Sequence, residues 1–372
     1  MIATVFLIGF LPNPRIYKRI ALAQNYSNVH LICWDRGKEM LESPTGRGFS
    51  CNIIRINAGN DPVSRVFPFE KFKKKALEIL TEKHPDIIHV QGLDMLQIAC
   101  KYKSIHKHVH IIYEIADLHR LLVDKQTGIL RAMAQKYLLW LDHKCSKQID
   151  LLIVTSQQYY TTYFSSFIPK EKVMFFPNIP DLSVFDTYQK KENHEQFTIG
   201  YFGVIRYKNE IRLLINSLTK HNARLIIAGY EENGTDIEEL CRNRSDIEWK
   251  GRYDFKNSAA SLYSQCDCIY AVYDASMSNC KVALPNKLYE AVYCELPILV
   301  ADQTHVGDIV RKQHVGIPVA HDSQSSIDSA LARLENKEEY DSFVSGCKRY
   351  KKELDLERYN NELVKRIEAF IS

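Results

Sequence analysis

Several features that would define other classes of protein are missing from this sequence. It has no run of about 18 apolar residues, so no membrane-spanning helix is expected. Its apolar start, MIATVFLIGFLPNPR, has no basic leader and no small-residue cleavage site, which favours a first strand over a signal peptide. The ten cysteines form no CxxC pair and no zinc-type spacing, and we interpret them as free thiols of a reducing, cytoplasmic compartment. Without GxGxxG, GxxxxGK[ST] or HExxH, NAD-type, P-loop and metal sites lose their strongest support, and we expect neither a resident cofactor nor a metal.

Charge is unevenly distributed along the 372 residues, whose net charge is +4. Residues 1–186 hold 24 basic and 17 acidic side chains, whereas residues 187–372 hold 25 and 28. Lysines cluster at residues 71–75 and 101–107. Such clusters are typical of a solvated face, or of attraction to an anionic membrane or a phosphate-bearing acceptor. We expect no nucleic-acid binding, because basic and aromatic residues are not interleaved and no known binding module is present.

Short apolar runs alternate with amphipathic stretches along the whole chain. The length exceeds one ordinary core, so two domains are expected. Strand–helix–strand alternation predicts an α/β protein with two doubly wound parallel sheets, each covered on both faces. The expected strands are residues 3–9, 29–34, 53–56, 87–90, 110–114, 151–155 and 173–176 in the first domain, and 197–203, 223–229, 247–251, 268–273 and 297–301 in the second.

The polar stretch LSVFDTYQKKENHEQ, residues 182–196, has no usable period and has the character of a linker. We expect a first domain at residues 1–186, a linker at 187–196 and a second domain at 197–353. The last segment, residues 354–372, is a polar amphipathic helix with no strand after it, and such a helix needs a surface on which to dock.

One stretch, ALPNKLYEAVYCELPILVAD at residues 283–302, suggests a binding site. Ligands of open parallel sheets bind beyond the carboxyl ends of the strands, near helix N-termini. Here Asn286, Lys287 and Leu288 form the first turn of a predicted helix. Because a cation on the first turn opposes the helix dipole, Lys287 does little for the helix itself. Together with the free amides of the helix start, it would attract phosphate.

Other residues could complete such a site. Arg206 and Lys208 follow another strand of the second domain and, with Lys287, could neutralise a diphosphate. Glu290 lies three residues after Lys287, on nearly the same helix face. Its carboxylate could accept hydrogen bonds from the vicinal hydroxyls of a ribose. An ordinary Lys–Glu pair on a surface helix explains the spacing equally well.

Seven segments, in order, give the chain a resemblance to a known family. PNKLYEAVYCELPILVAD resembles the P-x-K-x-x-E-x-x-A…G-x-P-V-I motif of GT-B glycosyltransferases, especially the retaining family-4 (glycosyl transferases group 1) proteins of bacterial surface polysaccharide synthesis. The other similar segments are PRIYKRIALAQNYSNVHLICWDRG, PDIIHVQG, IIYEIADLHR, EKVMFFPNIPD, FTIGYFGVIRYKNEIRLL with ARLIIAGYEENG, and the run from WKGRYDF to AVYD. The resemblance covers roughly the whole chain.

The resemblance implies two Rossmann-like domains facing across a cleft, with the last helix crossing back to the first domain. The second domain would bind a UDP- or GDP-linked sugar donor, and the first a glycan or lipid-linked glycan acceptor. Glu290 would bind the ribose, and residues 274–281 would border the donor sugar. The loop near Gly9 and Arg15 would close over the phosphates and the acceptor. The implied activity is metal-independent, retaining glycosyl transfer in capsule or O-antigen synthesis, in the cytoplasm or at the inner face of the membrane.

The chain departs from the family pattern at three positions. Val282 stands where many members carry a second glutamate, and Asn279 or Lys281 would have to substitute for it. Ala116 replaces the histidine of a Y-D-x-H-D segment, and Glu295 replaces the glycine before the last strand of the motif. These changes indicate a divergent branch.

The catalytic groups follow from these assignments. Arg206 and Lys287 would stabilise the leaving diphosphate. Asp117 is the first candidate for a catalytic base, with Glu114 and His119 behind it, and a front-face retaining mechanism would need no protein base. We interpret His89 as a buried histidine with its hydrogen bonds satisfied. Two alternatives remain open: a GT-B-fold sugar-nucleotide epimerase and a catalytically silent partner subunit.

Overall fold

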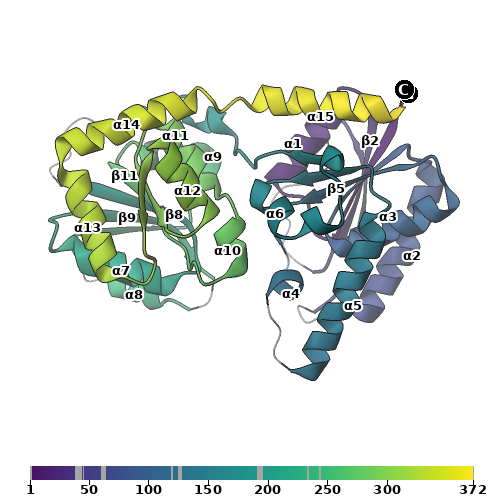
Figure 1. The fold of residues 1–372 in the computed structure, drawn as a ribbon, viewed down its shortest axis with the longest axis horizontal. Coiled ribbons are helices and arrows are strands. Elements are labelled where there is room, and N and C mark those ends of the chain that lie inside the picture. The colour runs from purple at the N-terminus through teal and green to yellow at the C-terminus, as the bar shows by residue number, and fades with distance from the viewer. Residues whose placement is uncertain are drawn as a thin grey trace. The chain divides into compact units, whose positions relative to one another are not determined.

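The structure is a computed structural model, and it describes residues 2–37, 44, 46–59, 64–118, 120–124, 128–190, 196–232, 234–242 and 244–371. It divides into two compact units (Figure 1). Unit 1 comprises Met1–Pro177 and Glu357–Ser372, and unit 2 comprises Asn178–Leu356. The last helix therefore belongs to unit 1, and residues 178–186 belong to unit 2. Part of the expected linker, residues 191–195, lies outside the described residues.

Unit 1 is built on a seven-stranded parallel sheet in the order β3-β2-β1-β4-β5-β6-β7. The strand order reverses direction between β1 and β4, which is the doubly wound pattern. The strands are β1 (Ala3–Ile8), β2 (Asn28–Asp35), β3 (Ser50–Arg55), β4 (Ile87–Gln91), β5 (His110–Ile115), β6 (Leu151–Val154) and β7 (Val173–Phe175).

The helices of unit 1 follow from local sequence signals. Asn13 caps α1 by accepting a hydrogen bond from the Ile16 amide at 3.2 Å, and Pro14 occupies the first helical position. The last helix packs on this unit: Phe370 stacks on His110 with ring centroids 5.4 Å apart. The elements are α1 (Pro14–Ala23), α2 (Val66–Lys83), α3 (Leu93–Ile105), α4 (Arg120–Val123), α5 (Ile129–Ser146), α6 (Gln157–Thr162), α15 (Leu356–Ile371) and the 3-10 turns η1 (Phe164–Ser166) and η2 (Lys170–Lys172).

Unit 2 has a six-stranded parallel sheet in the order β10-β9-β8-β11-β12-β13. Its strands are β8 (Thr198–Ile205), β9 (Arg224–Glu231), β10 (Ile247–Gly251), β11 (Cys268–Ala271), β12 (Ile298–Ala301) and β13 (Gly316–Val319). Its helices are α7 (Lys208–Leu218), α8 (Asp236–Cys241), α9 (Phe255–Tyr263), α10 (Ser278–Val282), α11 (Asn286–Tyr293), α12 (His305–Gln313), α13 (Gln324–Glu335) and α14 (Lys337–Lys351), with the 3-10 turn η3 (Leu182–Phe185). The prediction of two doubly wound parallel-sheet domains is confirmed, although β13 was not among the expected strands.

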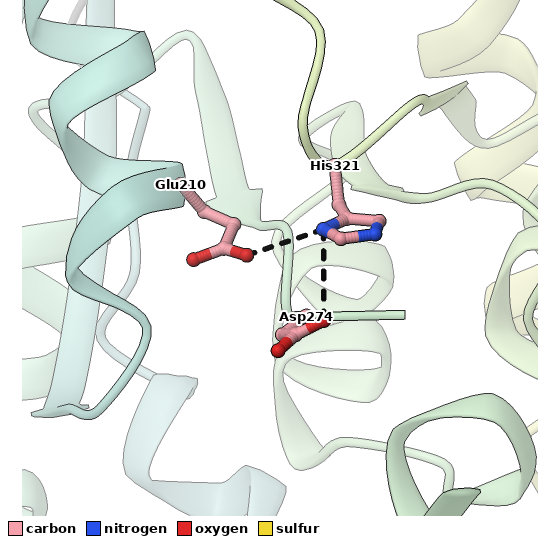
Figure 2. A group of neighbouring side chains, drawn as sticks. All are labelled: Glu210, Asp274 and His321. Atoms are coloured by element: carbon pink, nitrogen blue, oxygen red, sulfur yellow. Dashed lines mark hydrogen bonds and ion pairs between the residues drawn. The ribbon is translucent and has the colours of Figure 1, made fainter. Parts of the chain in front are cut away.

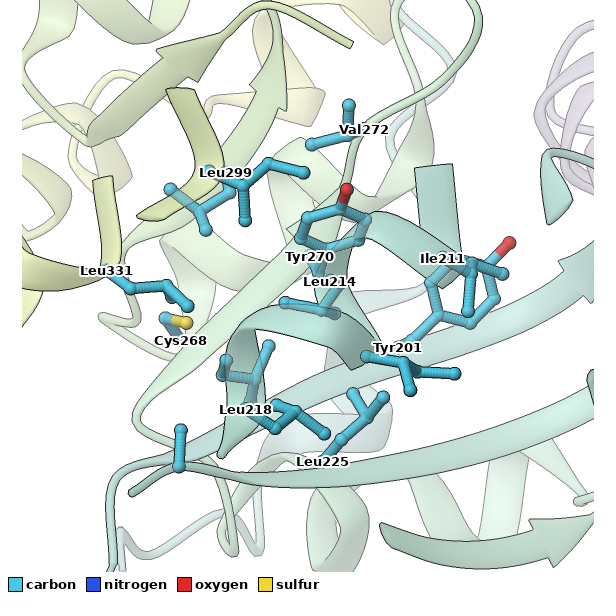
Figure 3. Close-up of a cluster of buried hydrophobic side chains, with 14 of the residues drawn as sticks. Tyr201, Ile211, Leu214, Leu218, Leu225, Cys268, Tyr270, Val272, Leu299 and Leu331 are labelled. Carbon is cyan, nitrogen blue, oxygen red and sulfur yellow. The ribbon is translucent and has the colours of Figure 1, made fainter. Parts of the chain in front are cut away.

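The core of unit 2 explains why α7 lies on its sheet (Figure 3). Ile211, Leu214 and Leu218 recur at helical spacing and are fully buried over the strand residues Tyr270 and Leu225. Burying one such side chain contributes about 1.5–3 kcal/mol of hydrophobic free energy. The described helices include none that is long and apolar enough to cross a membrane.

The sheet of unit 2 also contains one backbone approach that only glycine permits. At the end of β9, Gly229 has φ +159°, and a Cβ there would lie 1.8 Å from the carbonyl oxygen of Gly203 in β8. A side chain at residue 229 would push the two strands apart. The carboxyl ends of β8 and β9 can therefore stay close at the edge where a ligand is expected.

Candidate functional site

The start of helix α11 lies at the carboxyl edge of the unit 2 sheet. The strands β8 and β11 are parallel neighbours, but the chain continues from β8 to β9 on one side and from β11 to β12 on the other. Open α/β sheets bind ligands at such a switch point. The helix begins at Asn286 after an extended Pro285, with no side-chain cap. The Leu288 amide donates to the Pro285 carbonyl at 3.1 Å, which leaves the amides of Asn286 and Lys287 for a ligand. Asn178 donates to the Asn286 side chain at 3.0 Å. Leu288 is fully buried and anchors the helix on its sheet.

Lys287 and Glu290 form a buried ion pair on this helix. Lys287 Nζ donates to Glu290 Oε2 at 2.5 Å, and the two side chains are 13% and 2% exposed. The Tyr263 hydroxyl donates to the same oxygen. In the described part of the chain, no hydrogen bond reaches Glu290 Oε1. The carboxylate is therefore held rigidly by one oxygen and can accept a ligand hydroxyl with the other.

The electrostatics of this pair favour a charged lysine. Burial by itself lowers the pKa of Lys287, but the Glu290 carboxylate offsets that effect, and the net result is a pKa above the usual 10.5. The ammonium group is thus present throughout the neutral range. Lys287 also reaches β8, because a Cβ at Gly203 would lie 3.9 Å from its Cε. A permanent positive charge is thereby fixed against the carboxyl end of β8.

Tyrosine side chains surround this charge. Burial raises the pKa of Tyr273 to about 12, and both Lys287 and Arg206 act on that phenol electrostatically. Tyr207 stacks on Tyr273 with centroids 4.9 Å apart. The phenol of Tyr253 also interacts with Lys287. These rings make the surroundings of the cation largely apolar, which strengthens its interaction with an anion.

Arg206 and Lys208 are placed differently from each other. Arg206 is 57% exposed and pairs with Glu232 at 2.8 Å, and its charge also acts on the phenol of Tyr273. Lys208 pairs with Glu231 at 2.8 Å and with Asp236 at 2.9 Å. No ion pair or hydrogen bond of the described residues joins Lys208 to the Lys287 pair. Each of the three predicted cations thus pairs with carboxylates of its own, and their grouping around a diphosphate stays a prediction.

A cluster that the sequence analysis did not identify lies at the same sheet edge (Figure 2). His321 Nδ1 lies 3.2 Å from Glu210 Oε1 and 3.8 Å from Asp274 Oδ1. Glu210 follows β8, Asp274 follows β11 and His321 follows β13. Polar residues that follow strands could have indicated this cluster from the sequence. His321 could not be placed in this way, because β13, the strand before it, was not predicted.

In unit 1, Arg15 lies on the first turn of α1, not in the loop before it as expected, and its side chain is beside a buried polar network. Glu114 is 1% exposed, accepts from Arg19 Nε at 3.2 Å and bonds His89 Nε2 at 2.9 Å. Burial raises the pKa of Glu114, but the charge of Arg19 and the His89 hydrogen bond lower it more, so the net pKa is well below its usual value. A carboxylate so strongly held as an anion is unsuited to act as a base. The interpretation of His89 as a satisfied buried histidine is confirmed.

Arg15 offers polar atoms at the edge of that network. Its Nη2 donates weakly to Gln91 Oε1 at 3.4 Å, and its Nε lies 4.0 Å from Glu114 Oε1. Arg15 Nε, Gln91 Nε2 and Glu114 Oε1 are buried and have no hydrogen-bond partner among the described residues. Gly9 follows β1 nearby, and a Cβ there would touch Met95 at 3.4 Å. Unit 1 thus has unsatisfied donors and acceptors at the carboxyl edge of its sheet.

The candidate bases lie just after β5. Asp117 is exposed and His119 lies outside the described residues. Ala116, which replaces a family histidine, has a backbone role: its carbonyl accepts from Thr155 Oγ1 at 3.1 Å and from Tyr159 Oη at 3.2 Å. The chain after β5 is therefore fixed through its backbone.

Glu295, which replaces the family glycine, has a strained backbone conformation. Its φ is +59°, in the left-handed region that favours glycine. Its carboxylate lies 3.4 Å from Lys351 and 3.9 Å from Lys348, both on α14. The family glycine is thus explained by backbone geometry, and the glutamate here gains ion pairs in exchange for strain.

Two α/β units, each with a doubly wound parallel sheet, define the GT-B fold. Sucrose-phosphate synthase from Thermosynechococcus elongatus is similar over 100% of this chain and 99% of its own, with 14% identity and a TM-score of 0.74. Anabaena Alr3699/HepE in complex with UDP has 13% identity and a TM-score of 0.74, over 99% of this chain and all of its own. WaaG, a glycosyltransferase involved in lipopolysaccharide biosynthesis, has 13% identity and a TM-score of 0.67, with 97% and 98% coverage. These similarities establish the fold.

The sequence of unit 2 matches a family model. Residues 196–337 match the family model described as glycosyl transferases group 1. Over these residues the resemblance to glycosyl transferases group 1 is confirmed, and the fold of the chain is that of GT-B glycosyltransferases. The retaining family-4 assignment stays a prediction. A search of curated proteins finds no match.

Proposed function

We propose that the chain transfers a sugar from a UDP- or GDP-linked donor, and that this donor binds at the start of α11. The observation that carries the proposal is the Lys287–Glu290 pair: a fixed cation beside open helix amides, next to a carboxylate with one free oxygen. The amides and the cation suit a diphosphate, and Glu290 Oε1 suits a ribose hydroxyl. The related fold of HepE in complexes with UDP and with UDP-glucose supports this assignment.

In the proposed reaction, the bond between the anomeric carbon and the diphosphate oxygen breaks, and the acceptor hydroxyl oxygen bonds to that carbon. Lys287, Arg206 and the α11 amides stabilise the charge that develops on the leaving diphosphate, so the departure itself requires no metal ion. With retention of configuration, the acceptor proton passes to the leaving phosphate on the same face. Asp117 and His119 are the protein groups proposed to assist that transfer.

The acceptor is proposed to be a glycan or lipid-linked glycan of bacterial surface polysaccharide synthesis, bound by unit 1. The unsatisfied polar atoms of Arg15, Gln91 and Glu114 would pair with sugar hydroxyls, with Gly9 beside them. Structural similarity to WaaG and to the outer-core galactosyltransferase WaaB supports this direction. An epimerase would instead convert the donor without acceptor, and a silent subunit would leave the donor intact. Incubating UDP- and GDP-sugars with the purified chain, with and without acceptor, separates the three.

We also propose a cytoplasmic location with peripheral membrane contact. All ten cysteines are free thiols, as in a reducing compartment. Helix α5 exposes several apolar side chains together with the cations Arg131 and Lys136, a combination suited to an anionic lipid surface. The apolar residues are Ile129 (81% exposed), Leu130 (83%), Met133 (63%), Tyr137 (59%) and Trp140 (55%). If this contact exists, Leu130→Ser should weaken co-sedimentation of the chain with phosphatidylglycerol vesicles. Equal co-sedimentation of the variant and wild type would exclude it.

The donor site is tested with Glu290→Gln, which keeps the size of the side chain and removes its charge. A hydrogen bond to a charged group contributes about 1.5–3 kcal/mol, so UDP or GDP affinity by calorimetry should fall about 10- to 100-fold. Glu295→Gln, five residues further on, is the matched control and should bind as wild type does. Equal affinity of Glu290→Gln and wild type for both nucleotides would reject the ribose role.

A further inference from the structure

The cluster of Glu210, Asp274 and His321 joins three elements of unit 2 (Figure 2). Glu210 lies on the first turn of α7, Asp274 follows β11, and His321 follows β13. Each residue contributes one ligand-type atom, and these three atoms lie within 4.8 Å of one another. Figure 2 shows the Nδ1 side of the imidazole facing both carboxylates. The parallel sheet thus collects the three groups at one point of its carboxyl edge.

The charges in this cluster do not balance. Glu210 is only 6% exposed, and neither its carboxylate nor that of Asp274 pairs with a lysine or arginine anywhere in the described ranges. Other enclosed carboxylates of unit 2 have such a partner: Glu290 has Lys287 and Glu231 has Lys208. Even a protonated imidazole would supply one positive charge against two negative ones. Because a desolvated carboxylate is costly without a counter-charge, the cluster calls for a further cation.

We propose that this cluster binds a divalent transition-metal ion through Glu210 Oε1, Asp274 Oδ1 and His321 Nδ1. One imidazole nitrogen with two carboxylate oxygens suits ions such as Mn²⁺, Co²⁺ and Zn²⁺. Bonds of about 2.0–2.2 Å place two ligand atoms of one ion about 3–4 Å apart. The observed separations from Nδ1, 3.2 and 3.8 Å, fall within that range. Asp274 is 32% and His321 22% exposed, so the ion can enter from solvent and retain water ligands.

The proposed ion would fasten the segment after β11 to the rest of unit 2. Asp274 is the residue next to Tyr273, whose phenol interacts with both Lys287 and Glu290. Its carboxylate also accepts from the Ser276 amide at 2.8 Å, which fixes the turn that follows. An ion at this point would hold the border of the proposed donor pocket without touching the diphosphate cations. This consequence for donor binding rests on the proposed function, whereas ion binding itself does not.

The test is metal binding to the full chain after chelator treatment, without nucleotide. Calorimetry with Mn²⁺ should give one site per chain, and the ion should raise the melting temperature. Co²⁺ absorption should show no thiolate charge-transfer band, which excludes the cysteines as ligands. His321→Ala and Glu210→Gln should each weaken Mn²⁺ binding at least about tenfold. Asp322→Asn, next along the chain and outside the cluster, is the control and should bind as wild type does.

Two results would overturn the proposal: a wild-type chain that binds no Mn²⁺, or a His321→Ala variant that binds it equally well. Circular dichroism of each variant verifies that weaker binding does not reflect unfolding. Glu290→Gln should bind Mn²⁺ normally while losing nucleotide affinity. The metal site and the donor site can therefore fail independently of each other.

Discussion

Replacing Lys287 by methionine tests whether the buried pair on α11 acts as a unit. Methionine has a similar length and removes only the charge and the hydrogen bonds of the ammonium group. In the variant, the Glu290 side chain, which is only 2% exposed, remains buried but loses the Lys287 ammonium group as its counter-charge. Removing one partner of a buried pair costs about 3–5 kcal/mol in the free energy of unfolding.

The structure places the expected cost at the lower end of that range. Lys287 keeps 13% exposure, and the Tyr263 hydroxyl still donates to Glu290 after the substitution. We therefore expect Lys287→Met to lower the free energy of unfolding by about 3 kcal/mol. The double variant Lys287→Met/Glu290→Gln leaves no buried charge and should return to within about 1 kcal/mol of wild type. The coupling between the two positions would then be about 2 kcal/mol or more.

Urea unfolding of the wild type, both single variants and the double variant supplies the four free energies of the cycle. Trp249 packs on the core of unit 2, so its fluorescence reports on the unit that contains the pair. Nucleotide titration of the same proteins measures whether the diphosphate site is lost as well. The reasoning is refuted if Lys287→Met costs less than about 1 kcal/mol, or if the two single effects add to the effect of the double variant.

The pH dependence of stability provides a second test of the Lys287→Met prediction. In wild type, the pKa of Lys287 is raised above 10.5, so its stabilising contribution is complete across neutral pH and is lost only at higher, alkaline pH. In Lys287→Met, that contribution is absent at every pH. The deficit of the variant relative to wild type should consequently be constant across neutral pH and shrink only as the pH rises above 10.5.

Two further predictions concern stability away from the site. Glu295→Gly should raise the free energy of unfolding by about 1 kcal/mol in urea unfolding. Glycine relieves the left-handed φ of +59°, and the lost ion pairs with Lys348 and Lys351 are partly exposed and therefore weak. A less stable variant would show that the ion pairs dominate. Burial raises the pKa of Asp142 from its usual 3.8 to about 6, against hydrogen bonds such as that from Tyr163 Oη at 2.7 Å. The stabilisation by the neutral Asp142 side chain is therefore present below about pH 4 and is lost as the pH rises through 6. Asp142→Asn should consequently raise the free energy of unfolding by about 2 kcal/mol at about pH 8 and leave it unchanged at about pH 4. Equal gains at both pH values would contradict the role of ionisation.

Most of the fold could be predicted from sequence because buried parallel strands leave apolar runs of a recognisable length. The strand β13 was the exception. Its four residues, Gly316–Val319, include Pro318, and proline within a short run argues against a strand. The structure tolerates it at the edge of the sheet, where the missing amide breaks no ladder. Pairing with β12 in three dimensions, and not local propensity, made this segment a strand.

The site on α11 was predictable in part for a similar reason. Lys287 and Glu290 are three residues apart on one helix, so their contact follows from helical geometry alone. Lys208 illustrates the limit, because its partners Glu231 and Asp236 come from a strand and a helix further along the chain. Competition between possible ion pairs is decided by which carboxylates the fold brings within reach, and local spacing carries no information about that.

The sequence by itself determined two doubly wound sheets, a family resemblance in seven ordered segments, and a Lys–Glu pair at a helix start, since each depends on residues close together along the chain. Tertiary structure alone decided that Glu210, Asp274 and His321 meet, that Glu290 keeps one carboxylate oxygen open, and that Glu114 is held as an anion. These features arise where the carboxyl ends of distant parallel strands converge at one edge of a sheet. Burial there fixes the charges and hydrogen bonds of side chains that are far apart in sequence.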